Sequence, residues 1–322
     1  MTCPNTVTMS LVDAWLPPSR ENWELLCYAF QFFPLVRYKT RNPKTRHITL
    51  QCTNTYSLSQ FTAVQWLTDF YPQGKTSIES RLNLPGKWAW AGMESVGFLA
   101  VLYSLYTIPA REGLGTASSL PWGNWTMAGI YTLHYVYRAL VFPWAQPSMS
   151  PIHPLVAASA ACWNLVNGLC IGGWVGGYGP RTDADWAGRL YVIEVGLVVW
   201  GWGLLGNMFH DDDLREIRRS VARRRRERAE KEGKAAEGVE KLYMMPKNGL
   251  FHYVLFAHYL CEWVEWTGFW MVGGWHCVPA RSFLVNEIAT MLPRALAGKR
   301  WYIEKFGKEK VGNRKAVIPG IL

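Results

Sequence analysis

Three polar side chains recur at helical spacing where a long apolar run ends: Asn207, Asp211 and Arg218. At about 100° per residue, they fall within about 40° of one another around a helix. Asn and Asp can hydrogen-bond amide or ribose hydroxyl groups, and Arg suits a bidentate phosphate contact. This stripe predicts a nucleotide bound along the end of a helix. Arg215, about 80° from Asn207, is expected at the edge of the stripe or against lipid phosphates.

Ionisable side chains also lie inside the apolar stretches, where they are costly unless they face a cavity or a partner. The group comprises Glu94, His134, Arg138, Glu194, His258, Glu262 and Glu265. His134 and Arg138 are one helical turn apart, and the last three residues share one helix face. Inward charges on several helices predict a polar pocket within a bundle. A purely structural network of ion pairs is the alternative.

The elements that must position these residues are apolar stretches, since crossing a bilayer takes about 20 residues. Five strong candidates and two weaker ones lie near 88–109, 122–143, 155–178, 187–209, 250–278, 23–38 and 280–297. A soluble helical protein with a very apolar core is the alternative.

Charge favours the membrane interpretation, because Lys and Arg gather in three segments that seven crossings place on one side. The segments are 37–46, 215 onward and 299–315. We therefore predict an all-α polytopic membrane protein with about seven transmembrane helices and a cofactor pocket on the cytosolic side. Its N-terminus is expected to be lumenal and its C-terminus cytosolic.

Other motifs are weaker guides to function. Gly201–Gly206 fits G-x-G-x-x-G, but it lies inside an apolar run without the strand–helix context of a dinucleotide fingerprint. Small residues for close helix packing are the better interpretation. The seven cysteines form no Cys-x-x-Cys pair, so neither a disulfide framework nor a metal site is expected. The Arg-rich run 223–226 is interleaved with Glu and indicates a solvated helix rather than nucleic-acid binding.

Several of these residues lie in motifs that resemble the steroid 5α-reductase family. The motifs are Gly206-Asn-x-x-x-Asp211-x-x-Leu-Arg-x-x-Arg218, Tyr243-Met-Met-Pro-Lys-Asn-Gly-Leu-Phe251, Glu262-Trp-Val-Glu-Trp266, Arg300-Trp-Tyr302, Asn313-Arg-Lys-Ala-Val-Ile-Pro319, His134-Tyr-Val-Tyr-Arg138 and Glu94. Residues 81–322 are accordingly expected to form the catalytic membrane domain. Residues 1–80 form an N-terminal region with one weak span, and 219–240 is an Arg/Glu-rich cytosolic insert.

The resemblance implies a reductase of the endoplasmic reticulum that uses NADPH to saturate the double bond of a 3-oxo-4-ene steroid or similar enone lipid. In such enzymes, hydride goes to the β-carbon while a Glu and a Tyr hold the carbonyl oxygen. These roles carry over to Glu94 and Tyr135, with Trp90 also at the substrate. The cofactor roles carry over to Asn207, Asp211, Arg218, Tyr243, Glu262, Arg294 and Tyr302, together with Arg138 and His258. The sequence departs from the family pattern at Met244, His258 and Gly298.

Other functions remain open at this point. A reductase of the same superfamily could act on polyprenols or on trans-2-enoyl-CoA. A membrane methyltransferase of the isoprenylcysteine type would instead take a methyl group from S-adenosylmethionine. A di-iron hydroxylase needs several His-rich boxes, and the seven scattered histidines supply none. The expected partners are the bilayer and a small lipid or steroid. The sequence does not set the oligomeric state, and a monomer fits it.

Overall fold

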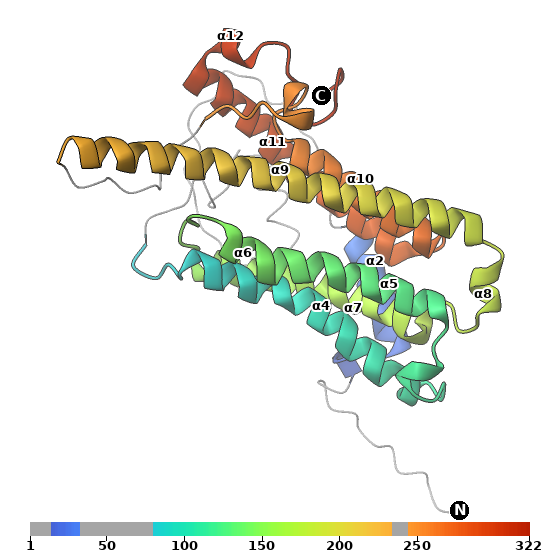
Figure 1. The fold of residues 1–322 in the computed structure, drawn as a ribbon. Coiled ribbons are helices and arrows are strands. Elements are labelled where there is room, and N and C mark those ends of the chain that lie inside the picture. Colours follow the sequence, from blue (N-terminus) through green and yellow to red (C-terminus); the bar gives the residue numbers. More distant parts are fainter. Residues whose placement is uncertain (1–13, 33–79, 234–243) are drawn as a thin grey trace, which may run out of the picture.

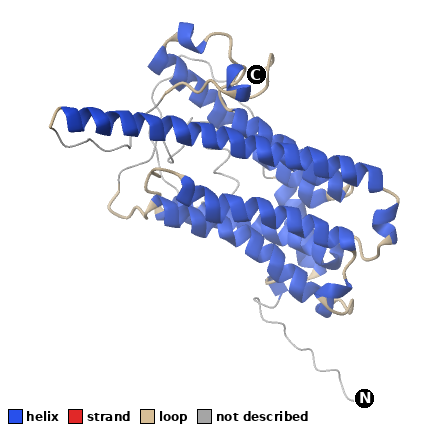
Figure 2. Ribbon diagram, viewed as in Figure 1, coloured by secondary structure: helices blue, strands red, loops and turns tan. Residues whose placement is uncertain are grey.

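The computed structural model describes residues 14–32, 80–233 and 244–322 of the chain (Figure 1). Within these ranges the regular elements are helices and no β-strand occurs (Figure 2). The α-helices are α2 (Arg20–Gln31), α4 (Gly86–Arg111), α5 (Trp122–Tyr135), α6 (Phe142–Ala145), α7 (Pro154–Gly173), α8 (Ala184–Ala187), α9 (Leu190–Lys231), α10 (Ala257–Gly273), α11 (Val278–Phe306) and α12 (Lys308–Val311). Short 3-10 turns occupy Ala117–Ser119 and Gly249–His252, and π-helical segments occupy Val136–Val141 and Trp174–Tyr178. The prediction of an all-α fold is confirmed for the described residues.

A helix lies in each of the seven predicted apolar stretches, although the bounds differ. Among the described helices, three are long and apolar enough to cross a membrane: α4, α7 with its continuation to Tyr178, and α9. The stretch 250–278 is only partly helical, because the backbone N–H groups of Leu255 and Phe256 bond to Lys315 and Ala316 instead of continuing a helix. Seven crossings therefore remain a prediction.

Two helix pairs form the centre of the bundle, α9 with α10 and α4 with α7 (Figure 1). Small residues allow both contacts. A Cβ added to Gly203 would lie 2.2 Å from the backbone nitrogen of Glu265, and one added to Gly168 would lie 2.3 Å from the carbonyl oxygen of Gly97. Within the Gly201–Gly206 run, Gly203 and Gly206 thus serve close packing against α10, as expected for small residues between membrane helices, whereas a Cβ added to Gly201 would have no neighbour within 4 Å.

The interior between these pairs is mainly aromatic. Tyr131 of α5, Trp266 and Phe269 of α10 and Phe283 of α11 are almost completely buried. Their rings pack edge to face or tilted, at centroid distances of 4.5–5.9 Å, a geometry that adds to the stabilisation from burial alone. This core fixes α5, α10 and α11 around the polar residues described below.

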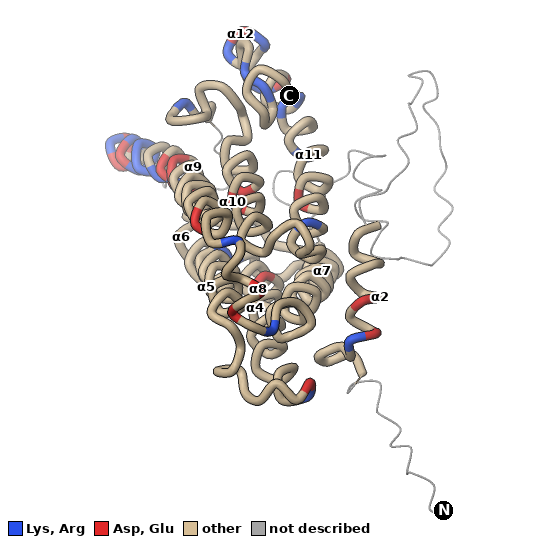
Figure 3. The backbone as a smooth tube through the Cα atoms, turned by 90° about the vertical axis from the view of Figure 1, so that its right-hand side faces the viewer, with Lys and Arg blue, Asp and Glu red and all other residues tan. Residues whose placement is uncertain are grey.

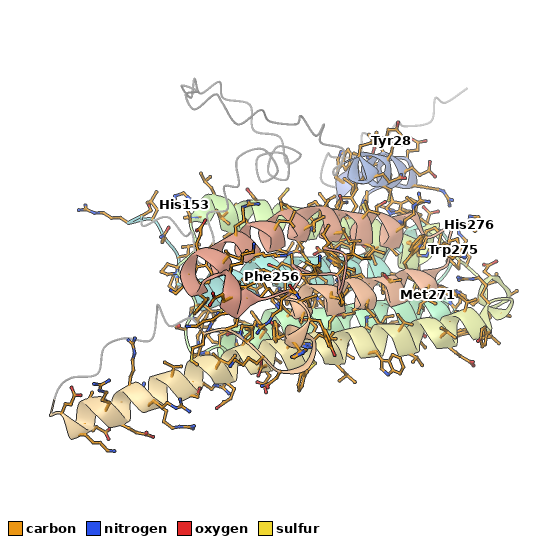
Figure 4. The ribbon with its side chains drawn as sticks, turned by 90° about the horizontal axis from the view of Figure 1, so that it is seen from above. Tyr28, His153, Phe256, Met271, Trp275 and His276 are labelled. Atoms are coloured by element: carbon orange, nitrogen blue, oxygen red, sulfur yellow. The ribbon has the colours of Figure 1, made fainter. Side chains whose placement is uncertain are left out.

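Helix α9 has 42 residues, which corresponds to about 63 Å at 1.5 Å per residue, and it projects beyond the other helices (Figure 1). Its projecting end carries a dense mixture of basic and acidic residues, whereas charged residues are sparser along the bundle (Figure 3). The expectation of a solvated helix holds as far as Lys231, because the side chains of 223–228 are exposed. Phe256 lies toward this end of the bundle, and Met271, Trp275 and His276 lie at the opposite end (Figure 4).

Candidate active site

Glu94 and Tyr135 are linked through one amide side chain. Tyr135, the last residue of α5, is buried and donates its hydroxyl hydrogen to Oδ1 of Asn164 on α7 at 3.3 Å. Asn164 Nδ2 donates to Glu94 Oε2 on α4 at 3.2 Å. Three helices therefore bring the two predicted catalytic residues to one place. Sequence reasoning missed Asn164; its amide within the apolar stretch 155–178 was a signal, but Asn167 carries the same one.

Arg138 lies beside this pair, with Trp90 and Phe142 around it. The guanidinium lies 5.0 Å from the Trp90 ring centroid and 4.7 Å from that of Phe142, within the range of cation–π attraction. Trp90 Nε1 donates to the Arg138 carbonyl oxygen at 3.1 Å. A guanidinium nitrogen lies 3.6 Å from Asp211 Oδ2 on α9. Arg138 thus connects the predicted substrate residue Trp90 with the predicted cofactor residue Asp211.

The backbone around Arg138 is a π-helical segment, Val136–Val141. Pro143 follows closely and has no N–H to donate to the carbonyl oxygen of Ala139, so the regular α-helical ladder cannot continue. A π-helical turn holds one more residue than an α-helical turn, and such turns are frequent at functional sites. The wider turn changes the direction in which Tyr137 and Arg138 leave the helix relative to Tyr135.

The polar stripe on α9 faces the bundle. Asn207 and Asp211 are buried, whereas Arg218, about two turns further on, is partly exposed. Asn207 Nδ2 donates to Glu262 Oε2 of α10 at 3.3 Å. Asn207 Oδ1 is buried and has no hydrogen-bond partner among the described residues. Because buried polar atoms normally have partners, this oxygen is suited to accept a hydrogen bond from a bound molecule.

Arg215 is more deeply placed than the sequence indicated. Its side chain is buried and donates to the Tyr137 hydroxyl at 2.9 Å and to the Asp211 carbonyl oxygen at 3.2 Å. Asp212 Oδ1 lies 3.6 Å from its Nε. The suggestion that Arg215 faces lipid phosphates is therefore wrong, since the π-helical segment brings Tyr137 against this side of α9. The hydrogen bond from Arg215 holds the Tyr137 side chain next to Arg138.

The two acids of α10 have separate partners. Glu262 contacts Asn207, whereas Glu265 Oε1 lies 2.6 Å from Nδ1 of His134 on α5. Both members of the second pair are buried, at 3% and 0% exposed side-chain area. On the helix face shared by His258, Glu262 and Glu265, the two acids thus bond to different helices, α9 and α5. For Glu265, the alternative of a structural ion pair is the one that the contacts support.

One predicted inward acid points outward, and another acid was missed. Glu194 is exposed, because the face of α9 that packs on α10 runs through Gly196, Trp200 and Gly203, and Glu194 lies two residues out of phase with it. Glu287 on α11 instead interacts electrostatically with Glu94, Glu262, Arg138 and Arg294. Its position within the weak stretch 280–297 was the signal that could have identified it.

The remaining predicted cofactor residues lie toward the end of the bundle near Phe256. His258 is half-buried, with ring centroids 6.2 Å from Phe251 and 6.0 Å from Phe256. Arg294 is half-buried and interacts electrostatically with Glu287. Tyr302 is buried, with its ring 6.2 Å from Phe256. Tyr243 lies outside the described residues.

One departure from the family pattern has a steric reason. A Cβ at Gly298 would lie 2.1 Å from Cζ of Phe256, so a larger side chain would displace the Phe256 ring from its position beside Tyr302. Met244 is exposed, and nothing in the structure explains its presence at that position.

These helices and their buried polar residues define the class of the protein: over the described ranges it is an all-α bundle with three helices able to cross a membrane and a charged site between its apolar helices. Comparison with known sequences gives the family. The profile of the 3-oxo-5-alpha-steroid 4-dehydrogenase family matches residues 149–322. The chain therefore belongs to this family of oxidoreductases, and the resemblance seen in the motifs is confirmed.

Individual relatives extend the match upstream. An uncharacterized protein of Schizosaccharomyces pombe is 34% identical over 263 residues, which cover 78% of this chain and 91% of that protein. The steroid 5-alpha-reductase DET2 of Solanum lycopersicum is 30% identical over 262 residues, covering 80% and 90%. The 3-oxo-5-alpha-steroid 4-dehydrogenase 1 of Bos taurus is 27% identical over 253 residues, covering 77% and 86%. These coverages require matches before residue 149, where Glu94 and Tyr135 lie.

Proposed function

We propose that the protein reduces the carbon–carbon double bond of a 3-oxo-4-ene steroid, or of a similar enone lipid, with NADPH as reductant. The observation that carries the proposal is the placement of a carboxyl and a phenol, Glu94 and Tyr135, on either side of Asn164. Two donors so placed can converge on one carbonyl oxygen. Family membership supplies the reaction type, and steroid names among the relatives favour a steroid substrate.

The chain's own part in the reaction is to stabilise charge on the substrate oxygen. NADPH, when bound, supplies hydride to the β-carbon of the enone. Tyr135 donates its hydroxyl hydrogen to the carbonyl oxygen, and Glu94 donates when it is protonated, so that negative charge developing there meets donors already in place. Trp90 forms a wall of the substrate site and is held by its hydrogen bond to the Arg138 carbonyl oxygen.

The residues present suit a nicotinamide dinucleotide. Asn207 Oδ1 is a buried acceptor without a partner in the described part of the chain and fits an amide or ribose hydroxyl donor. Arg138 and Arg218 supply positive charge near Asp211, and Arg294 supplies it from α11. Arginine side chains fit the additional phosphate group that distinguishes NADPH from NADH. We assign Tyr243, Glu262, His258 and Tyr302 to the same cofactor site.

Arg218 offers a direct test of the cofactor site. Arg218→Ala is expected to weaken NADPH binding by about 1.5–3 kcal/mol, because a charge-assisted phosphate contact is lost. Steroid affinity of the cofactor-loaded enzyme should remain near that of the unmodified chain. NADPH fluorescence titration measures the first quantity. Arg224→Ala, at an exposed position of α9 beyond Arg218, is the matched control, and an equal loss there would show a general effect of surface charge.

The reaction itself is tested by NADPH oxidation with purified protein in lipid. A 3-oxo-4-ene steroid, a polyprenal and a trans-2-enoyl-CoA serve as alternative acceptors, and methyl transfer from S-adenosylmethionine is measured in parallel. We expect oxidation of NADPH with the steroid and formation of its saturated 3-oxo product. NADPH oxidation with the polyprenal or the enoyl-CoA but not with the steroid would contradict the proposed substrate. Methyl transfer without NADPH oxidation would contradict the proposed reaction.

We further propose that the protein resides in the endoplasmic reticulum membrane with a lumenal N-terminus, a cytosolic C-terminus and seven crossings. The cofactor stripe of α9 and the basic segments would then share the cytosolic side. Protease added to sealed microsomes should reach epitope tags placed after Arg41, within 228–238 and after Leu322. Protection of any one of the three tags would contradict the arrangement.

A further inference from the structure

Asn164 is the residue that both proposed catalytic groups contact, and its role rests on the proposed function. It is buried on α7, with 5% of its surface exposed. Its side chain makes three hydrogen bonds: with the Tyr135 hydroxyl at 3.3 Å, with Glu94 Oε2 at 3.2 Å and with the Met93 carbonyl oxygen at 2.9 Å. An amide has two donor hydrogens on its nitrogen, and both are used here.

The Met93 contact fixes which end of the amide faces which partner. A backbone carbonyl oxygen can only accept, so the atom of Asn164 nearest to it must be the nitrogen. Oδ1 then faces the Tyr135 hydroxyl and accepts from it. The amide cannot flip without placing two acceptors against each other at Met93. The direction of all three hydrogen bonds is therefore set by the backbone of α4.

We infer that Asn164 is a positioning residue that keeps the Tyr135 hydroxyl and the Glu94 carboxyl from bonding to each other. A phenol beside a carboxylate donates to it directly, and that bond would take up the Tyr135 hydrogen and hold Glu94 in the ionised form, which cannot donate. With the amide between them, Glu94 Oε2 accepts from Nδ2, and Oε1 is left as the carboxyl oxygen that can carry a hydrogen. The Tyr135 hydrogen rests on a neutral amide oxygen, from which a substrate carbonyl oxygen can take it more readily than from a carboxylate, because hydrogen bonds to ionised acceptors are stronger.

The same helix provides a matched control. Asn167, one turn along α7, is completely buried and donates from Nδ2 to the Tyr131 hydroxyl at 3.1 Å. It therefore resembles Asn164 in residue type, helix, burial and bonding to a tyrosine. It does not contact Glu94, and it reaches Tyr135 only through the Tyr131 hydroxyl, which is hydrogen-bonded to the Tyr135 hydroxyl. Loss of either amide removes buried hydrogen bonds and lowers stability. A lower rate of hydride transfer in an Asn164 variant than in an Asn167 variant therefore reports positioning rather than folding.

The test uses single-turnover oxidation of bound NADPH by a saturating enone, in the full-length protein. Asn164→Leu, close in volume, and Asn164→Ser, whose hydroxyl is too short to reach both partners, should lower the rate about 10- to 100-fold, since small misplacements have effects of this size. NADPH affinity should be unchanged, and Asn167→Leu should retain the rate. The serine variant serves if the leucine variant does not fold.

A double variant separates positioning from a general defect. Combined with Tyr135→Phe, Asn164→Leu should add little to the loss, because groups that act as a unit are not additive. Rates like those of the unmodified chain in both Asn164 variants, or losses that multiply with that of Tyr135→Phe, would overturn the inference while the proposed function stands. If the unmodified chain failed to oxidise NADPH with every enone tested, both the inference and the proposed function would be overturned.

Discussion

Tyr135→Phe is expected to slow hydride transfer about 100- to 1000-fold, which corresponds to about 2.7–4 kcal/mol for one preorganised oxyanion donor. The ring remains and keeps its contacts with Tyr131 and Trp266, at centroid distances of 4.7 and 6.3 Å. Folding and NADPH binding should therefore persist. Single-turnover oxidation of bound NADPH by a saturating enone measures the effect without contributions from product release.

Glu94 provides the comparison. Glu94→Gln retains one donor hydrogen bond and should lose less activity than Glu94→Ala, which supports a protonated carboxyl as donor. Because Glu94 and Tyr135 are proposed to hold one oxygen, the double variant should lose less than the sum of the single losses. An undiminished rate in Tyr135→Phe would reject its assigned role and would direct attention to another polar residue of the bundle.

The second large effect concerns stability. Removing one partner of the buried His134–Glu265 pair, as in Glu265→Ala, should lower the free energy of unfolding by about 3–5 kcal/mol, because the remaining group is left buried without its partner. The 2.6 Å contact and the nearly complete burial of both side chains place the pair in this category. Thermal denaturation in a fixed detergent, followed by loss of monodisperse protein, measures the difference.

Two further variants test whether the loss of stability comes from breaking the buried pair. Replacing both partners by leucine removes the uncompensated group and should restore most of the stability, since apolar replacements of buried pairs are often neutral or stabilising. Glu194→Ala changes an exposed acid of α9 and should stay within about 0.5 kcal/mol. Equal destabilisation by Glu265→Ala and Glu194→Ala would contradict the proposed importance of the buried pair.

The positions of the helices were predictable from the sequence, because a long apolar stretch is a strong signal. The residues at which the helices begin and end were not predictable. Helix α9 continues past its apolar part to Lys231, and its polar stripe follows directly from helical spacing. Helix α10 begins only at Ala257, since the preceding backbone bonds to residues 315–316. That pairing joins segments far apart in the chain, and no local sequence pattern predicts it.

A site residue was predictable where its type alone limits the environment it can occupy. It was less predictable where contacts with other helices determine whether the residue is buried and what it binds. Glu262 is buried beside Asn207, as an acid inside an apolar stretch should be. Asn164 and Arg215 could not be separated from ordinary packing and surface residues without the neighbouring helices. The assignment of Glu194 to the interior failed because spacing relative to Gly196 and Gly203 becomes informative only when the partner helix is known.

The placement of acids on α10 also has a consequence for how the chain is made. In the proposed arrangement of seven crossings α10 spans the bilayer, where a carboxylate near the helix centre opposes insertion by about 2.5–3.5 kcal/mol, and this 17-residue helix carries both Glu262 and Glu265. Their contacts, His134 on α5 and Asn207 on α9, leave the ribosome earlier. Segment 257–273 should thus be retained in the bilayer when synthesised after α5 and α9, but poorly when fused alone to a reporter in a translocon assay. The order of the helices along the chain thus ensures that the partners of both α10 acids are already synthesised when α10 emerges.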